Sequence, residues 1–298
     1  MENLYIQFRN SLNTIHKEYC LRKYHNYLIM KYIVSFTTSP TRIHKCQPML
    51  NSLLQQSRKP DLIILNIPYV FARTGKEYTI PTHVSQSICV NQIEIDYGPG
   101  TKIIPTIHFL QDKGYESNDT RIIYLDDDIQ YPINMIHTYE KIIKDNDDSV
   151  WTATGFNFLD LKIFGERRHN MQATIAEGYG GVCVKMNTFH DDFYPYINKY
   201  ITDVDCRLSD DIILSNYYHK QKIPIKILNI RGKYSIIDMW QNKCILEYGN
   251  EVDALHNGAN GTSETNVKRY NKVIRKLGKE KERFFKVYFT NKGKLQMY

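Results

Sequence analysis

The segment Arg121-Ile122-Ile123-Tyr124-Leu125-Asp126-Asp127-Asp128 places three consecutive aspartates directly after an apolar run. The run is short and rich in β-branched side chains, which predicts a buried strand that ends where the carboxylates begin. Carboxylates packed this closely repel one another unless a divalent cation or ordered hydrogen-bond donors offset their charge. The segment therefore predicts either a metal site at a strand end or an acidic cap on a following helix that begins near Pro132.

Apolar runs of the same kind alternate with segments of helical periodicity along the chain. This alternation predicts the α/β class, with a Rossmann-like, mostly parallel sheet flanked by helices. Strands are predicted at 32–36, 62–67, 88–95, 121–125, 150–154 and 182–185, and helices at 47–56, 104–113, 132–144 and 210–219. Ligands of open sheets bind outside the carboxyl ends of the strands, so the three aspartates would lie where a nucleotide and its metal bind.

The loop after the first predicted strand, Thr37-Thr38-Ser39-Pro40-Thr41-Arg42, contains no glycine. It therefore matches neither the glycine-rich dinucleotide fingerprint nor the Walker A phosphate loop, which disfavours dehydrogenases and P-loop ATPases. A phosphotransferase of the aspartyl-phosphate type would need its paired aspartates after the first strand. Here they follow a later one, so that class is disfavoured as well.

Length and cysteine usage narrow the class of protein. The 298 residues suffice for one large α/β domain or two small ones. The six cysteines are scattered without C-x-x-C pairs, which indicates buried thiols in a reducing compartment rather than a zinc site or a disulfide framework. No apolar stretch approaches the ~20 residues of a membrane span, and no secretory signal pattern opens the chain. We therefore expect a soluble cytoplasmic protein.

The positive charge is concentrated at the C-terminus. The chain carries a net charge of +7, and its last 36 residues hold 11 Lys or Arg against 3 Glu. Within this segment Val267, Tyr270, Ile274 and Leu277 recur at helical spacing, which predicts a basic amphipathic helix. Such a helix either docks on the body with a solvated basic face or contacts anionic membrane lipid or an acidic or phosphorylated acceptor. No nucleic-acid recognition motif accompanies the charge, so nucleic acid is not an expected partner.

Three segments in order carry a resemblance to a known family: Val34 to Arg42, Asp96-Tyr97-Gly98-Pro99-Gly100-Thr101-Lys102, and Leu125-Asp126-Asp127-Asp128. Together they resemble a nucleotide-sugar-dependent glycosyltransferase of the GT-A fold with a D-x-D motif, similar to the inverting family 2 group. The resemblance runs from residue 32 to about residue 260. It implies a single GT-A domain over 31–262, preceded by a helical extension at 1–30 and followed by a basic helical segment at 263–298.

In such enzymes the D-x-D carboxylates hold Mn²⁺ or Mg²⁺ against the diphosphate of the donor. The resemblance implies metal ligands at Asp126, Asp128 and His256. It implies donor-binding side chains at Thr37, Arg42, Asp96, Lys102, Asp126 and Asp127. Arg42 is otherwise explained as a surface residue at a helix entry. Asp96 and Lys102 are otherwise explained as parts of a turn.

Two later segments complete the resemblance. Gly180 and Gly181 precede a predicted strand and would let the backbone approach the transferred sugar or the acceptor, or else form a flexible strand entry. Asp210 and Asp211 would supply the catalytic base, Asp211 first, although Ser209 followed by two acidic residues is also the pattern of an ordinary helix N-terminus. No Q-x-x-R-W segment follows them, which indicates a non-processive enzyme.

The resemblance implies a metal-dependent hexosyltransferase that uses a UDP-sugar donor and inverts configuration. Its acceptor would be a hydroxyl of a glycan, a protein or a lipid-linked molecule. Two other functions stay open: a non-catalytic carbohydrate- or anionic-lipid-binding protein on a transferase scaffold, and a nucleotidyltransferase. The sugar, the acceptor, the linkage and the oligomeric state are not set by these residues.

Overall fold

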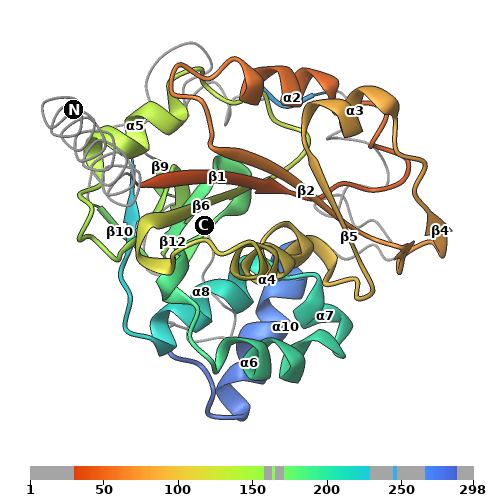
Figure 1. Cartoon of the computed structure of the whole chain (residues 1–298). Helices are drawn as coiled ribbons and strands as arrows, with labels where there is room; N and C mark the ends of the chain where they lie inside the picture. Colours follow the sequence, from red (N-terminus) through yellow and green to blue (C-terminus); the bar gives the residue numbers. More distant parts are fainter. Residues whose placement is uncertain (1–29, 158–162, 165–170, 229–243, 247–265, 287–298) are drawn as a thin grey trace, which may run out of the picture.

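The computed structural model describes residues 30–157, 163–164, 171–228, 244–246 and 266–286 (Figure 1). An eight-stranded mixed sheet forms its centre, in the order β10-β13-β7-β12-β6-β1-β2-β5. Six of these strands run in one direction, and β12 and β10 run antiparallel to their neighbours. The predicted α/β class with a mostly parallel sheet is therefore confirmed.

The strands are short, and two small sheets, β11-β8-β9 and β3-β4, adjoin the main one. Their bounds are β1 Lys31–Phe36, β2 Leu62–Pro68, β3 Val70–Phe71, β4 Lys76–Glu77, β5 Cys89–Ile93, β6 Thr120–Leu125, β7 Val150–Thr152, β8 Thr154–Phe156, β9 Ile163–Phe164, β10 Met171–Ala173, β11 Ile175–Ala176, β12 Val182–Lys185 and β13 Ile225–Ile227.

Helices cover both faces of the main sheet, because the central strands are apolar on both sides. In β1, Val34 and Phe36 pack on one face with α2, α3 and α5, while Ile33 packs on the other with α4, α6, α8 and α10. The helices are α2 Gln47–Leu54, α3 Thr82–Ser87, α4 Ile104–Asp112, α5 Met135–Ile142, α6 Phe193–Ile201, α7 Val204–Arg207, α8 Asp210–Lys220 and α10 Asn266–Lys279.

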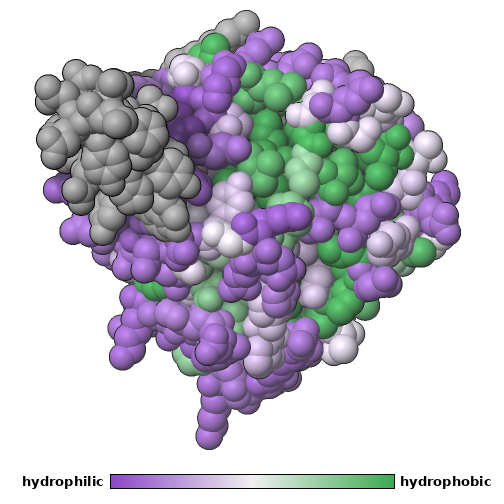
Figure 2. Space-filling view, viewed as in Figure 1, coloured by the Kyte–Doolittle hydropathy of each residue, from purple (hydrophilic) through white to green (hydrophobic). Residues whose placement is uncertain are grey.

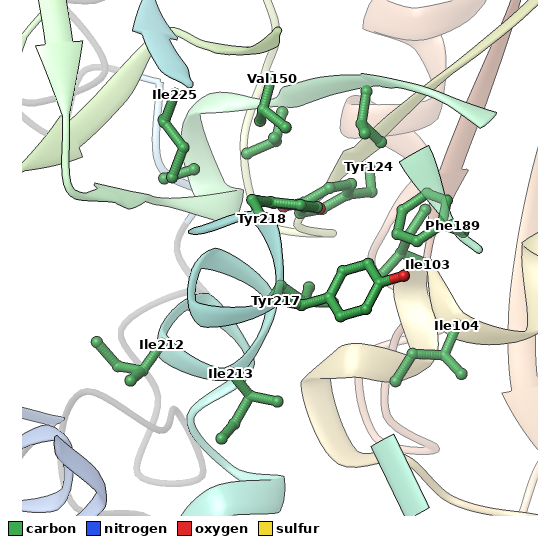
Figure 3. Packing of buried hydrophobic residues seen from close by; sticks show 14 of the residues in the cluster. Ile103, Ile104, Tyr124, Val150, Phe189, Ile212, Ile213, Tyr217, Tyr218 and Ile225 are labelled. Carbon is green, nitrogen blue, oxygen red and sulfur yellow. The ribbon is translucent and has the colours of Figure 1, made fainter. Parts of the chain in front are cut away.

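Helix α8 is buried almost all round, which is why its sequence shows no polar stripe. Tyr217 and Tyr218 lie under the sheet beside Phe189 (Figure 3), and the Tyr218 hydroxyl lies 3.2 Å from that of Tyr124 in β6. This packing fixes the N-terminus of α8 relative to the end of β6. The two acidic segments of the sequence, one at each of these ends, are thereby held in a fixed relation.

The basic C-terminal helix α10 packs on the body of the protein. Val273, Ile274 and Leu277 are buried in the same core as α8, whereas Lys268 on the same helix is exposed. Hydrophilic residues protrude at the lower end of the molecule, where α10 lies (Figure 2). Among the described residues, no helix is both long enough and apolar enough to cross a membrane.

The structure departs from the predicted elements in several places. The expected strand at 150–154 is divided into β7 and β8, which belong to different sheets, because the chain turns at Ala153. Thr152 stabilises this turn, since its hydroxyl donates to the carbonyl of Thr154 at 2.7 Å. The helices α3, α6 and α7 were not predicted, and the helix expected from Pro132 begins at Met135. The expected extension at 1–30 lies outside the described residues except for its last residue.

Candidate functional site

A polar pocket opens at the carboxyl ends of β1 and β6 and is closed by the N-terminus of α8 and the first turn of α10. It gathers side chains that are distant in the sequence. Its lining comprises Thr37, Thr38, Ser39, Arg42, Pro68, Phe71, Arg73, Tyr78, Asp96, Gly98, Pro99, Lys102, Asp126, Asp127, Asp128, Arg207, Leu208, Asp210, Asp211, Asn266, Arg269 and Tyr270.

The three aspartates follow directly on Leu125, the last residue of β6, and all three line this pocket. Their charge is offset by two cations. Nη2 of Arg42 lies 2.8 Å from Asp127 and 2.6 Å from Asp128, and Nζ of Lys102 lies 2.7 Å from Asp126. The repulsion that the sequence implied is thus balanced by ion pairs within the protein.

Asp127 is the most enclosed of the three. Its second oxygen accepts a hydrogen bond of 2.5 Å from the Thr38 hydroxyl, and the Thr38 carbonyl in turn accepts one from Tyr78. Burial raises the pKa of Asp127 to about 7, with the nearby Asp128 adding to the rise and Arg42 opposing it. Asp127 therefore ties the loop after β1 to the end of β6 and faces protein groups, whereas the side chain of Asp126 is 36% exposed.

Arg42 occupies a specific place in this site rather than the open surface. Its backbone N–H donates to the carbonyl of Ser39 in the turn after β1, and its guanidinium reaches across to Asp127 and Asp128. The structure therefore places Arg42 in the lining of the pocket. It pairs there with the aspartates.

Lys102 connects the two acidic groups of the site. Its side chain is only 4% exposed, and Nζ lies 2.7 Å from Asp126 and 3.0 Å from Asp210. Burial by itself lowers the pKa of Lys102, but the carboxylates of Asp126, Asp210 and Asp211 raise it well above its usual range. The ammonium is thus a fixed positive charge between the end of β6 and the start of α8.

A buried polar cluster holds the backbone of Lys102 in place. The Ser35 hydroxyl of β1 donates to the Lys102 carbonyl at 2.6 Å and lies 2.6 Å from the Thr106 hydroxyl. Asn66 of β2 donates to both hydroxyls, and Asn91 of β5 donates to Asn66. Every member of the cluster has a partner, so it anchors the lysine to three strands of the sheet.

Asp211 lies in the first turn of α8 and is held by two donors. The backbone N–H of Gly178 and the hydroxyl of Tyr270 each donate to one of its oxygens at 2.9 Å. Burial raises the pKa of Asp211 to about 8, and the neighbouring Asp210 adds to the rise while Lys102 opposes it. Ser209 precedes the helix but makes no side-chain capping bond, and Asp210 and Asp211 both line the pocket from the first turn of the helix.

Asp96 and Thr37 also line the pocket. Both oxygens of Asp96 accept backbone hydrogen bonds, from Ala72 at 2.8 Å and from Gly98 at 2.7 Å. Asp96 therefore joins the loop after β3 to the 3₁₀ helix Gly98–Lys102 that carries Lys102.

The glycines before β12 have separate places. Gly180 packs on Thr154, and Gly181 has φ +80° and faces Met135 and Tyr139, so neither is part of the pocket lining. Gly178 approaches the site most closely: a Cβ built there would collide with Nζ of Lys102 and lie 3.4 Å from Asp211. The close approach of the backbone to the site residues is therefore made by Gly178, two residues before Gly180.

Several pocket residues were not expected as site residues. Arg207, Arg269 and Tyr270 come from α7 and α10. Tyr270 belonged to the predicted apolar stripe of the basic helix, but no local signal in the sequence tied that helix to the aspartates. His256, the third metal ligand that the resemblance implied, lies outside the described residues.

The carboxylates suit an oxygen-ligated cation that is shared with a substrate. Asp126 and Asp128 each direct one oxygen to Lys102 or Arg42, which leaves the other carboxylate oxygen without a side-chain partner among the described residues. Within the described part of the chain, no group of three His, Cys, Asp or Glu side chains could hold a metal ion by itself. Mg²⁺ commonly takes one or two carboxylates and completes its shell with water and substrate phosphate, so two such ligands fit.

Comparisons with known proteins add little to this geometry. No family model matches the sequence, and no curated protein matches it at a significant level. The structure of S. aureus TarS 1–349 in complex with UDP is similar with a TM-score of 0.43 and 14% identity, over 66% of this chain and 57% of that chain. A second structure of S. aureus TarS 1–349 has a TM-score of 0.44 and 12% identity, over 84% of this chain and 74% of that one. Similarities with TM-scores below 0.5 identify neither the fold nor the function of this chain. We therefore infer the function from the pocket itself.

Proposed function

We propose that this protein is a metal-dependent glycosyltransferase of the GT-A type, which moves a hexose from a uridine diphosphate donor to an acceptor hydroxyl with inversion. The observation that carries the proposal is the position of Lys102. Its buried ammonium joins Asp126 at the end of β6 to Asp210 at the start of α8, so that both acidic segments face one pocket. A non-catalytic binding protein would not require the buried carboxylate of Asp210 in addition to that of Asp126.

The pocket offers separate places for the parts of a nucleotide sugar. Phe71 and Tyr78 line it at the end near the loop after β1, and their rings meet edge to face at 6.2 Å between centroids. Aromatic side chains of this kind suit a planar base. Hydrogen bonds link Tyr78 through Thr38 to Asp127 among the three aspartates, and ion pairs link Asp126 through Lys102 to Asp210, which precedes Asp211. The base, the diphosphate and the sugar of the donor would follow one another along this series.

Asp211 is the proposed base. Its carboxylate takes the proton of the acceptor hydroxyl while the oxygen attacks the anomeric carbon and the bond to the phosphate oxygen of the donor breaks. Gly178 and Tyr270 fix the orientation of the carboxylate, and two oxygens with four lone-pair positions still leave room for the substrate proton. Burial brings the pKa of Asp211 to about 8, near the value that suits a base working at neutral to mildly alkaline pH.

Lys102 and Arg42 would balance the negative charge of the departing nucleotide diphosphate. Asp126 and Asp128 would hold Mn²⁺ or Mg²⁺, which when bound supplies Lewis-acid stabilisation of the diphosphate. The acceptor would be a glycan, a protein or a lipid-linked molecule, and transfer would be non-processive. We also propose that the exposed basic residues of α10 contact an anionic membrane.

The donor class is tested by thermal unfolding of the full chain with uridine, guanosine and cytidine diphosphates, each with Mn²⁺ or with chelator. We expect UDP to raise the melting temperature more in Mn²⁺ than in chelator, because ligands that bind only the folded state stabilise it. The proposal fails if none of the three nucleotides stabilises the protein in a metal-dependent way.

Two variants separate donor binding from chemistry. Asp128→Ala should abolish the difference between Mn²⁺ and chelator, because it removes a proposed ligand. Asp211→Asn should keep UDP binding while removing transfer, since the amide takes up no proton. Asp112→Asn is the matched control, because Asp112 is exposed and lies outside the pocket. Full transfer activity in Asp211→Asn would show that another residue is the base.

A further inference from the structure

Two arginines of the pocket have no acidic partner among the described residues, in contrast to Arg42 and Lys102. Arg269 in the first turns of α10 is 3% exposed, and Arg207 at the end of α7 is partly buried. Both line the pocket, and the Nε atom of each is buried without a hydrogen-bond partner. Among the described residues, the side chain of Arg269 has one hydrogen-bond partner, the neutral amide of Asn266, and neither arginine has an acidic partner.

This lack of an acidic partner is costly for a buried guanidinium. A charge removed from water is stabilised only by an opposite charge or by a full set of hydrogen bonds. Arg42 meets this requirement through Asp127 and Asp128, and Lys102 meets it through Asp126 and Asp210. Among the described residues, no carboxylate balances the charge of Arg269 or Arg207, and their hydrogen-bonding capacity is not filled. This indicates that an anionic ligand supplies the missing partner.

The elements that carry the two arginines show on which side of the pocket the ligand would lie. Arg269 precedes Tyr270, whose hydroxyl donates to the proposed base Asp211. The stem of Arg207 packs against Gly98, where a Cβ would lie 2.8 Å from the carbonyl oxygen of Arg207 and 3.2 Å from its Cγ. Both arginines therefore line the pocket from α7 and α10, two helices that contact one another, and not from the loop after β1.

We propose that Arg207 and Arg269 form a phosphoryl-binding subsite of this pocket. The planar fork of a guanidinium matches the oxygens of a phosphoryl group and binds them through two parallel hydrogen bonds. The proposal rests on the proposed transferase function for the source of that group, which is either the diphosphate of the donor or a phosphoryl group on the acceptor. Both sources share the same chemistry, and binding experiments distinguish them.

The test uses calorimetric titration of the full chain and of three variants. Arg269→Gln and Arg207→Gln each remove one guanidinium, and Lys268→Gln removes one positive charge from an exposed position on the same helix. The ligands are UDP, uridine, and glycerol 3-phosphate added to the UDP-saturated protein. Circular dichroism and the melting temperature verify that each variant is folded. If Arg269→Gln does not fold, Arg207→Gln carries the test.

We expect both arginine variants to weaken binding of a phosphoryl ligand by about 10- to 100-fold, the cost of a lost hydrogen bond to a charged group, with Lys268→Gln unchanged. Weaker UDP binding with unchanged uridine binding identifies the donor diphosphate. Unchanged UDP binding with loss of glycerol 3-phosphate identifies an acceptor phosphoryl group. Unchanged affinity for both ligands in both arginine variants overturns the proposal.

Failure of the transferase assignment has a different signature. In that case the wild-type protein binds no nucleoside diphosphate, with or without Mn²⁺. Glycerol 3-phosphate added to the protein alone would then still bind in a manner that depends on Arg269, which supports the subsite without the transferase. Loss of glycerol 3-phosphate binding in Lys268→Gln as well would show that general positive charge, and not the subsite, attracts the anion.

Discussion

Replacement of Lys102 by methionine tests the central feature of the site, the buried ammonium between two acidic segments. The side chain of Lys102 is 4% exposed, and its partners differ in their access to water: Asp126 is 36% exposed and Asp210 is 8% exposed. Without the ammonium, Asp126 can be hydrated, but Asp210 becomes a buried charge without a cation. We expect the free energy of unfolding to fall by about 3 to 5 kcal/mol, the usual cost of removing one partner of a buried ion pair.

The assay is urea unfolding of wild type and Lys102→Met at pH 7 in chelator. The pKa of Lys102 is raised above its usual value, so its contribution to stability is complete below the unfolded pKa of about 10.4 and is lost only as the pH rises through the folded value. Measurements at pH 7 therefore contain the whole contribution. Lys185→Met is the control, because Lys185 is 8% exposed but its partner Asp148 is 58% exposed, and about 1 kcal/mol is expected.

A double-mutant cycle identifies the source of the loss. If the uncompensated charge of Asp210 causes it, Asp210→Asn should restore about 1 to 3 kcal/mol to the Lys102→Met protein. The reasoning is refuted if Lys102→Met costs less than about 1 kcal/mol, or if Asp210→Asn restores nothing in that background.

Three further predictions concern the elements around the base. Gly178→Ala should lower stability by about 1 to 3 kcal/mol and reduce activity, because the new methyl group displaces Lys102, and wild-type values in urea unfolding and transfer assays would contradict this. The kcat/KM for transfer should rise with pH through about 8 as Asp211 ionises. Tyr270→Phe should move this midpoint to higher pH, because it removes a hydrogen-bond donor to the carboxylate. A flat profile between pH 6 and 9 would exclude Asp211 as the base. Ile274→Ala should cost about 2 to 5 kcal/mol in urea unfolding, since Ile274 is fully buried, and a loss below about 1 kcal/mol would show that α10 is not part of the core.

The main elements of the sheet could be predicted because their signals are local. The apolar runs at β1, β2, β5, β6 and β12 and the periodic segments at α2, α4, α8 and α10 lie within a few residues of their predicted bounds. The shorter pieces were missed or merged for a physical reason. A turn such as that at Ala153 depends on one hydroxyl-to-backbone hydrogen bond and on the two sheets it joins, and neither leaves a periodic pattern.

The candidate site was predictable in part. Asp126 to Asp128, Arg42 and Asp211 stand at strand or helix ends, where polar residues beside apolar runs are visible in the sequence, and all of them line the pocket. The partners of each group were not visible. The pairing of Arg42 with two aspartates depends on how the loop after β1 folds over the end of β6, which involves residues more than 80 positions apart.

The sequence by itself determined the α/β class, the strand that ends in three aspartates and the amphipathic character of the C-terminal helix, since each follows from the spacing of apolar and charged residues within one segment. Only the tertiary structure decided which charges meet. It placed Lys102 between Asp126 and Asp210 and brought Arg269 and Tyr270 of the basic helix into the same pocket. The reason is that ion pairing and desolvation depend on distances between elements, and the packing of α8 and α10 under the sheet sets those distances.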